Sequence, residues 1–176
     1  MKPLTRHLVN YAHYHRDPRN IRTHFVGIPM IVVAVACLLA LLPLPLPGGL
    51  TAAHLITLAV IGFYFWLDLA LGAAMALAML AALTLGSSLA AGPHGWQWGA
   101  GLFALGWVIQ FIGHVFEGRK PAFVDDLTGL VIGPLFVVAE WLFACGLLRA
   151  LQADIEREAG PVRLRPHAAG AVGRHS

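Results

Sequence analysis

The sequence predicts an all-α integral membrane protein: a polytopic helical bundle of four to five transmembrane segments with an amphipathic N-terminal helix. Of the 176 residues, 58% are hydrophobic and only 12% are charged, about half of the roughly 25% found in soluble domains. Between Phe25 and Phe116 the only Asp, Glu, Lys or Arg is Asp68. A soluble fold covers its surface with polar groups, and this stretch lacks them. The sequence therefore excludes an ordinary soluble domain.

Five apolar segments have about the length of a spanning helix, which needs about 20 residues. They are Phe25 to Leu42, Leu50 to Leu67, Leu69 to Ala91, Trp96 to Phe116 and Thr128 to Leu148. Prolines and glycines between Pro43 and Gly49 predict a hairpin connection, because proline cannot continue a helix. Gly133-Pro134 interrupts the fifth segment, which either crosses the membrane or forms a re-entrant piece.

A single membrane-embedded domain is predicted over residues 1–151, and residues 152–176 are expected to be a disordered tail. The first 24 residues carry five cations, one acid and no pattern of a cleavable signal peptide. The positive-inside tendency therefore places the N-terminus on the cytoplasmic side. Arginines beside the membrane favour anionic lipid as a partner and argue against nucleic acid. The sequence contains no signal for an oligomeric state.

Polar residues gather first near the N-terminus. Leu4, Leu8, Tyr11 and His15 recur at helical spacing, which predicts an amphipathic helix along the membrane surface with Thr5 as its cap.

Asp17-Pro18 marks the start of the next helix, because an acceptor at the N-cap followed by proline is typical of a helix start. On this helix Asn20 and His24 are four residues apart and share one face. Gly27 leaves room beside them for another helix or a ligand.

A second group of polar residues lies at the end of the fourth apolar segment. Gln110, His114 and Glu117 fall on a narrow stripe of one helix face. Three glycines recur every seven residues along the same helix: Gly99, Gly106 and Gly113. Small residues at this spacing predict close packing against a neighbouring helix.

Four crossings would bring both polar groups to the same side of the membrane. Six residues could then converge near the cytoplasmic face: His15, Asn20, His24, Gln110, His114 and Glu117. Imidazoles, a carboxylate and orienting amides are the composition of a site for a first-row transition metal. The alternative is that each residue only makes a helix-packing hydrogen bond. The set as a whole favours a site, because burying a carboxylate and several imidazoles without partners is costly.

Four other polar residues have no single predicted role. Asp68 is expected to be a turn residue or a helix cap. Glu140 is a proton-binding group, a partner of residues near Arg149, or a group that supports a metal ligand. His13 and His54 have no assigned role.

Two motifs resemble those of a known membrane-protein family. The first reads Tyr-His-Arg-Asp-Pro-Arg-Asn from Tyr14 and His-Phe-Val-Gly-Ile-Pro from His24; the second reads Gln-Phe-Ile-Gly-His from Gln110, followed by Glu-Gly-Arg and Pro-Ala. Together they resemble the membrane 2-hydroxy fatty acid dioxygenase family of bacteria, fungi and plants, whose fungal member depends on iron. The resemblance covers residues 4–148 and implies a protein of the bacterial inner membrane.

The resemblance implies an Fe(2+) enzyme that shortens a 2-hydroxy fatty acid by one carbon with dioxygen, a process called α-oxidation. Carried over by position, the family's histidines fall on His15, His24 and His114. These residues are expected to be the catalytic metal ligands. Glu117 is expected either to join them as a ligand or to hydrogen-bond His114.

The same hypothesis assigns the remaining polar groups. Arg22, Arg119 and Lys120 are expected to bind the substrate carboxylate, while the acyl chain lies between spans in the hydrocarbon. Asn20 and Gln110 are expected to fix the imidazole tautomers.

Two alternative functions compete with the enzyme. One is a non-catalytic protein that binds or transports lipid. The other, which ranks lower, is a membrane haem protein that pairs histidines across two spans, such as His54 with His114.

Overall fold

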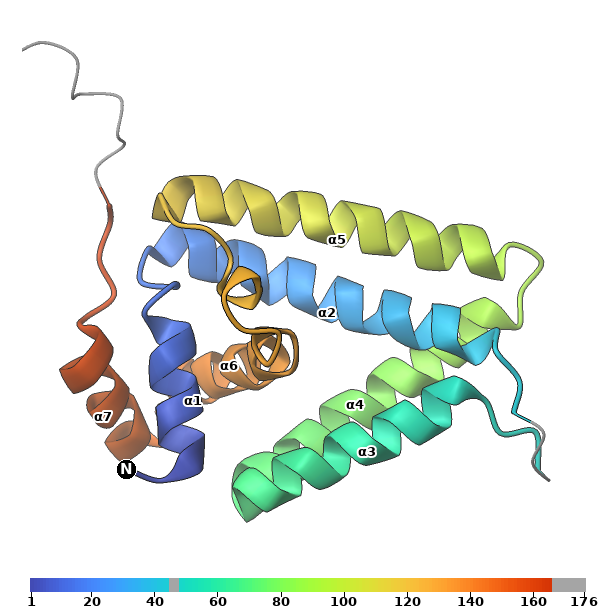
Figure 1. The fold of residues 1–176 in the computed structure, drawn as a ribbon, viewed down its shortest axis with the longest axis horizontal. Helices are drawn as coiled ribbons and strands as arrows, with labels where there is room; N and C mark the ends of the chain where they lie inside the picture. Colours follow the sequence, from blue (N-terminus) through green and yellow to red (C-terminus); the bar gives the residue numbers. More distant parts are fainter. Residues whose placement is uncertain (45–47, 166–176) are drawn as a thin grey trace, which may run out of the picture.

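The computed structural model describes residues 1–44 and 48–165, and these residues form helices and connecting turns without a strand (Figure 1). The helices are α1 (Pro3–Ala12), α2 (Pro18–Ala40), α3 (Ala52–Leu67), α4 (Leu69–Ala90), α5 (Gly95–Glu117), the 3-10 turn η1 (Ala122–Val124), α6 (Gly129–Ala144) and α7 (Arg149–Ala159). The predicted all-α class is confirmed.

In the described part of the chain, three helices are long and apolar enough to cross a membrane: α2, α4 and α5. Helices α6 and α7 make a fourth if the pair, bent by 117°, is one span. Helix α3 has 16 residues and measures about 24 Å at 1.5 Å per residue, less than the hydrocarbon core of about 30 Å. The count is thus three or four where the sequence predicts four or five. Helix α3 is short because Asp68 is extended and caps α4 by accepting from Leu71 N.

Helices α2 and α5 run antiparallel and side by side along the bundle (Figure 1). The predicted glycine stripe of α5 makes this close packing possible. A Cβ on Gly99 would lie 2.7 Å from Leu38, and one on Gly106 would lie 2.6 Å from Ile31. Gly27 of α2 is packed equally closely, because a Cβ on Gly27 would lie 3.0 Å from the Gly106 carbonyl oxygen. The start of α2 and the end of α5 therefore lie together.

Adding a methyl group to this interface should destabilise the bundle. A Cβ on Gly113 would overlap Thr23 Oγ1 and lie 2.5 Å from Asn20 Oδ1. We expect Gly113→Ala to cost about 1–3 kcal/mol, as overpacking does, and to lower the melting temperature in detergent. A Cβ on Gly101 of the same helix would meet no packing partner within 4 Å, so Gly101→Ala is the matched control. Equal melting temperatures for the two variants would contradict this packing.

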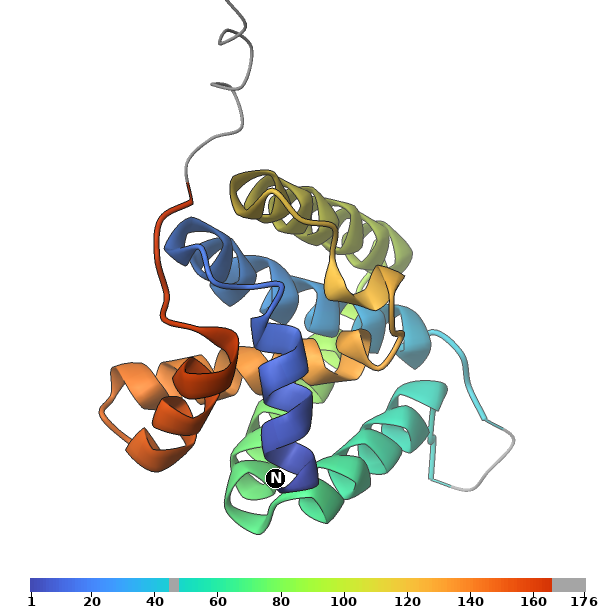
Figure 2. The ribbon, with the colours of Figure 1, turned by 60° about the vertical axis from the view of Figure 1, so that its left-hand side comes forward.

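Helix α1 lies across one end of the bundle, against α6 and α7 (Figure 2). Its buried face includes Leu4, Leu8 and Tyr11, as the predicted amphipathic pattern requires. The predicted cap is wrong: Lys2 precedes the first helical residue, Pro3, so Thr5 is buried inside the helix. Proline suits the first position of a helix because it has no N–H to leave unpaired.

The C-terminal part of the chain is ordered further than the sequence predicts. Helix α7 covers Arg149–Ala159, although the sequence predicts disorder from residue 152. Residues 160–165 then run along the turn between α1 and α2, where Arg163 N donates to Arg16 O at 2.9 Å. The sequence of α7 is rich in charged residues, and its one buried apolar residue, Ile155, is too weak a signal to predict a packed helix. The rest of the predicted tail, residues 166–176, lies outside the described residues.

Candidate metal centre

The turn between α1 and α2 positions His15. Helix α1 ends at Ala12, whose carbonyl oxygen accepts from His15 N at 3.0 Å. Asp17 then caps α2, with Oδ1 accepting from Arg19 N at 2.9 Å, and Pro18 is the first helical residue. This helix start agrees with the sequence prediction. Hydrogen bonds from Arg19 keep the pKa of the Asp17 carboxyl far below its ordinary value, so the cap is charged at neutral pH.

Three imidazoles meet where this turn joins α2 and α5, and we call them the histidine cluster: His15, His24 and His114. The Nε2 atoms of His15 and His24 are 3.0 Å apart. The His114 ring centroid lies 5.0 Å from that of His15 and 5.1 Å from that of His24. One ligand atom from each residue lies within 4.8 Å of the other two. The three side chains are 0%, 2% and 7% exposed, respectively.

The hydrogen bonds of His15 and His24 define their tautomers. The Nδ1 atoms lie 2.7 Å from the Tyr11 carbonyl oxygen and 2.9 Å from the Asn20 carbonyl oxygen, respectively. Because a carbonyl oxygen only accepts, each Nδ1 carries a proton, and each Nε2 of a neutral ring presents a lone pair. Two lone pairs therefore face each other at 3.0 Å, an arrangement that a bound cation would stabilise.

The cluster favours neutral imidazoles. Burial, together with the neighbouring His24, lowers the pKa of His15 well below its ordinary value. Neutral imidazole is the form that binds a transition metal. The donor set of the cluster therefore fits a divalent metal ion such as iron.

The side-chain amides of Asn20 and Gln110 were expected to fix the imidazole tautomers, but no described hydrogen bond joins either amide to an imidazole. The carbonyls of Tyr11 and Asn20 orient the imidazoles, while the Asn20 side chain donates to Tyr14 O at 3.3 Å and to Glu117 Oε2 at 3.1 Å. Gln110 is 4% exposed, and neither Nε2 nor Oε1 has a hydrogen-bond partner among the described residues. Backbone carbonyls leave no trace in residue types, so this orienting role could not be read from the sequence.

Glu117 lies near the histidine cluster in a set of contacts of its own. Its carboxylate accepts from Arg16 N at 3.0 and 3.1 Å and from Asp17 N at 2.8 Å. It also accepts from the Asn20 amide at 3.1 Å and pairs with Arg165 Nε at 2.7 Å. The side chain is 1% exposed, so these contacts satisfy a fully buried carboxylate.

These contacts define what Glu117 does in this structure. It ties the turn that carries His15 to the end of the helix that carries His114. Its oxygens are not among the ligand atoms that meet in the cluster, and no described hydrogen bond joins it to His114. In this structure the contacts of Glu117 therefore hold the His15 turn against the end of α5.

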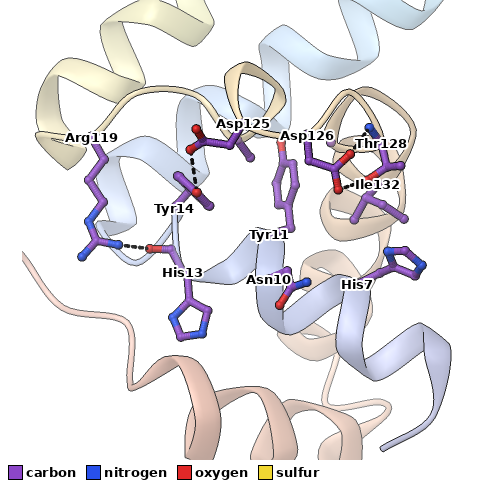
Figure 3. A pocket seen from close by; sticks show the side chains of 12 residues that line it. His7, Asn10, Tyr11, His13, Tyr14, Arg119, Asp125, Asp126, Thr128 and Ile132 are labelled. Atoms are coloured by element: carbon purple, nitrogen blue, oxygen red, sulfur yellow. Dashed lines mark hydrogen bonds between the residues drawn. The ribbon is translucent and has the colours of Figure 1, made fainter.

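In the structure, the side chains of the three predicted carboxylate-binding cations make contacts with groups other than the three imidazoles. Arg22 is exposed and donates to its own helix at 3.3 Å. Lys120 pairs with Asp125 at 2.5 Å. Arg119 donates to His13 O at 2.9 Å (Figure 3). Arg119 and Lys120 are exposed because they lie in the turn after α5, and Arg22 lies on an exposed face of α2.

Two hollows flank Tyr11. The outer one is an open polar pocket of about 420 Å³ that Arg119, Asp125 and Asp126 line (Figure 3). Its two aspartates make it a poor site for a carboxylate. The inner one is a cavity of about 70 Å³ beside His24 and His114. Tyr11 lines both hollows.

Two contacts near the site were not predicted from the sequence. Tyr11 stacks on His15, with centroids 4.1 Å apart and an angle of 4° between the rings. Buried Arg16 lies 3.7 Å from Glu140, which makes Glu140 its ion-pair partner. The helical spacing of Tyr11 and His15 was the only sequence signal for the first contact. The Arg16–Glu140 contact joins segments that are distant in the sequence, and no sequence pattern indicated it.

Fold and cluster together define a class: a helical membrane protein with a buried three-histidine cluster at one end of its bundle. The family described as 2-hydroxy-palmitic acid dioxygenase Mpo1-like matches residues 1–145, and the chain belongs to this family. A Saccharomyces cerevisiae relative, the 2-hydroxy-palmitic acid dioxygenase MPO1, is 32% identical over 154 residues, which cover 84% of this chain and 84% of the relative. No solved structure matches the chain. The family resemblance seen in the two motifs is confirmed.

Proposed function

We propose that the protein is an Fe(II)-dependent dioxygenase that shortens 2-hydroxy fatty acids by one carbon. The observation that carries the proposal is the pair of imidazole lone pairs facing each other at 3.0 Å in a buried cluster. Membership of the Mpo1-like family and the name of the yeast relative support the substrate class. The alternative of a lipid-binding or transport protein gives no reason for three histidines to meet.

The histidine cluster would hold the metal ion. Imidazole suits Fe(II), and three protein ligands leave positions open for other groups. Bound iron would supply the one-electron chemistry that dioxygen needs in order to react. The Tyr11 and Asn20 carbonyls hold the rings of His15 and His24, and Glu117 holds the His15 turn against α5. The buried setting excludes water from the reacting groups.

The overall reaction balances without an external reductant. One 2-hydroxy acid and one dioxygen contain the atoms of one shortened acid, one carbon dioxide and one water. The bond that breaks joins C1 to C2 of the substrate. Oxygen consumed and shortened acid formed should therefore be equal in moles.

Gln110 should bind the polar head of the substrate. Its unpartnered amide lines the inner cavity beside His24 and His114, and a buried polar group without a partner costs free energy unless a ligand satisfies it. We expect Gln110→Leu to weaken anaerobic binding of 2-hydroxyhexadecanoate about tenfold, or about 1.4 kcal/mol. Metal content should not change. Loss of metal would instead favour the tautomer-fixing role that the sequence predicts.

The test of the proposed function is anaerobic purification and metal analysis, followed by mass spectrometry after incubation with 2-hydroxyhexadecanoate and dioxygen. We expect bound iron and pentadecanoate as the product. Absence of both iron and the shortened acid would contradict the proposed function and favour a lipid-binding or transport protein. A Soret band would indicate the haem alternative.

We also propose that the histidine cluster lies at the cytoplasmic side of a bacterial inner membrane. The five cations and one acid of the first 24 residues support this orientation. A reporter fused before Lys2 should be active only in the cytoplasm, and periplasmic activity would contradict the orientation.

A further inference from the structure

The inner cavity beside the histidine cluster adjoins a larger apolar cavity that is open on one side, where the lining residues Ile56 and Leu130 are exposed. The larger cavity has a volume of about 340 Å³, and residues of α2, α3, α4, α5 and α6 line it. Five residues line both cavities: Ile31, Val32, Trp107, Leu130 and Pro134. The two cavities are therefore neighbours, and apolar side chains form the boundary between them.

The walls of the larger cavity suit a hydrocarbon. No Asp, Glu, Lys, Arg or His is among the described residues that line it. Three lining side chains carry a polar atom: Thr57, Tyr64 and Trp107. The Tyr64 hydroxyl is already satisfied, because it donates to Val131 O at 2.7 Å. The volume of this half-open cavity falls within the range of ligand pockets, about 300–1,000 Å³. A cavity of this size and lining can take an apolar ligand.

The length of the path fits a long acyl chain. His24 and Leu39 lie fifteen positions apart on α2, which corresponds to about 22 Å along the helix at 1.5 Å per residue. Half of the bilayer hydrocarbon, about 15 Å, is the depth that one lipid chain fills. The path to Leu39, which lines the far part of the larger cavity, is longer than this depth, so only a long chain in an extended form approaches its end.

We propose that the substrate's acyl chain lies against the protein in the half-open cavity between α2, α3, α4, α5 and α6, with its head at the histidine cluster. This inference rests on the proposed function and differs from the expectation that the chain lies between spans in the bilayer. Ala53 of α3 lines the cavity near the end of α2 and is 1% exposed. The side chain at position 53 therefore determines which lengths of substrate acyl chain the cavity accepts.

The test narrows this end of the cavity. Ala53→Phe places a ring in the path, whereas Ala59→Phe makes the same change on the exposed side of α3, outside the cavity lining. With 2-hydroxy acids of different lengths, Ala53→Phe should lower the ratio of kcat/KM for hexadecanoic over decanoic substrates at least tenfold. Ala59→Phe should leave this ratio as in the parent. The same ratio in all three proteins would overturn the proposal.

A second measurement separates this inference from the proposed function. Saturation binding of radiolabelled hexadecanoate and decanoate to the purified protein needs no turnover. If the parent shortens no 2-hydroxy acid, the proposed function fails, and the binding ratio still decides where the chain lies. If Ala53→Phe does not fold, Leu39→Trp narrows the same end from α2 and should lower the same ratio. An unchanged ratio in a folded variant would again overturn the acyl cavity.

Discussion

Replacing His114 by alanine should abolish both metal retention and turnover. His114 supplies the part of the histidine cluster that comes from α5, and without it only His15 and His24 remain. Loss of groups that merely orient a metal ligand costs 10- to 100-fold in affinity or activity, so loss of a ligand should cost more than about 100-fold. Metal per chain after anaerobic purification and rate of product formation are the two measurements.

His94→Ala is the matched control, because His94 is an exposed histidine before α5 and makes no side-chain cap. It should keep parental metal content and rate. His24→Ala should behave like His114→Ala. Full activity in the His114 variant would remove His114 from the site, whatever its metal content.

Replacing Glu117 by alanine should cause the largest loss of stability. The change removes the acceptor of Arg16 N and Asp17 N and leaves Arg165 without its partner. Each buried backbone N–H left without an acceptor costs about 1–3 kcal/mol, whereas Arg165, whose side chain is 26% exposed, can be solvated. Thermal unfolding in detergent should show a large fall in melting temperature. Glu158→Ala, at a half-exposed ion pair on α7, is the control and should change stability little.

The variant Glu117→Gln distinguishes positioning from metal ligation. Gln keeps an acceptor for the backbone N–H groups of the turn but loses the charge that pairs with Arg165. A positioning residue predicts lower stability with full metal occupancy at saturating Fe(II). A metal ligand predicts the reverse: parental stability and little bound metal.

The sequence predicted much of the site because its signals are local. Asp17-Pro18 starts α2 through a cap and a first-position proline, and both act within one helical turn. The spacing of Gln110, His114 and Glu117 predicted their shared buried face. Placing both polar groups on one side of the bundle then needed only the order of the helices. Each of these steps follows from helix geometry alone.

The parts that the sequence could not predict depend on contacts between distant segments. Arg165 reaches Glu117 only because α7 folds back along α1. The outward course of the chain after α5 decides that Arg119 faces a polar pocket and not the cluster. The length of α3 depends on whether Asp68 continues one helix or caps the next. Residue types alone leave each of these alternatives open.

X-ray absorption at the iron edge of the anaerobically purified protein tests the central claim most directly. Outer-shell scattering from imidazole rings reports histidine ligands independently of turnover. A site made of His15, His24 and His114 predicts imidazole scattering from about three rings, in line with the three histidines that meet in the structure. It also predicts that His24→Ala loses the iron signal. An iron spectrum without imidazole scattering, or one unchanged in His24→Ala, would contradict the three-histidine site.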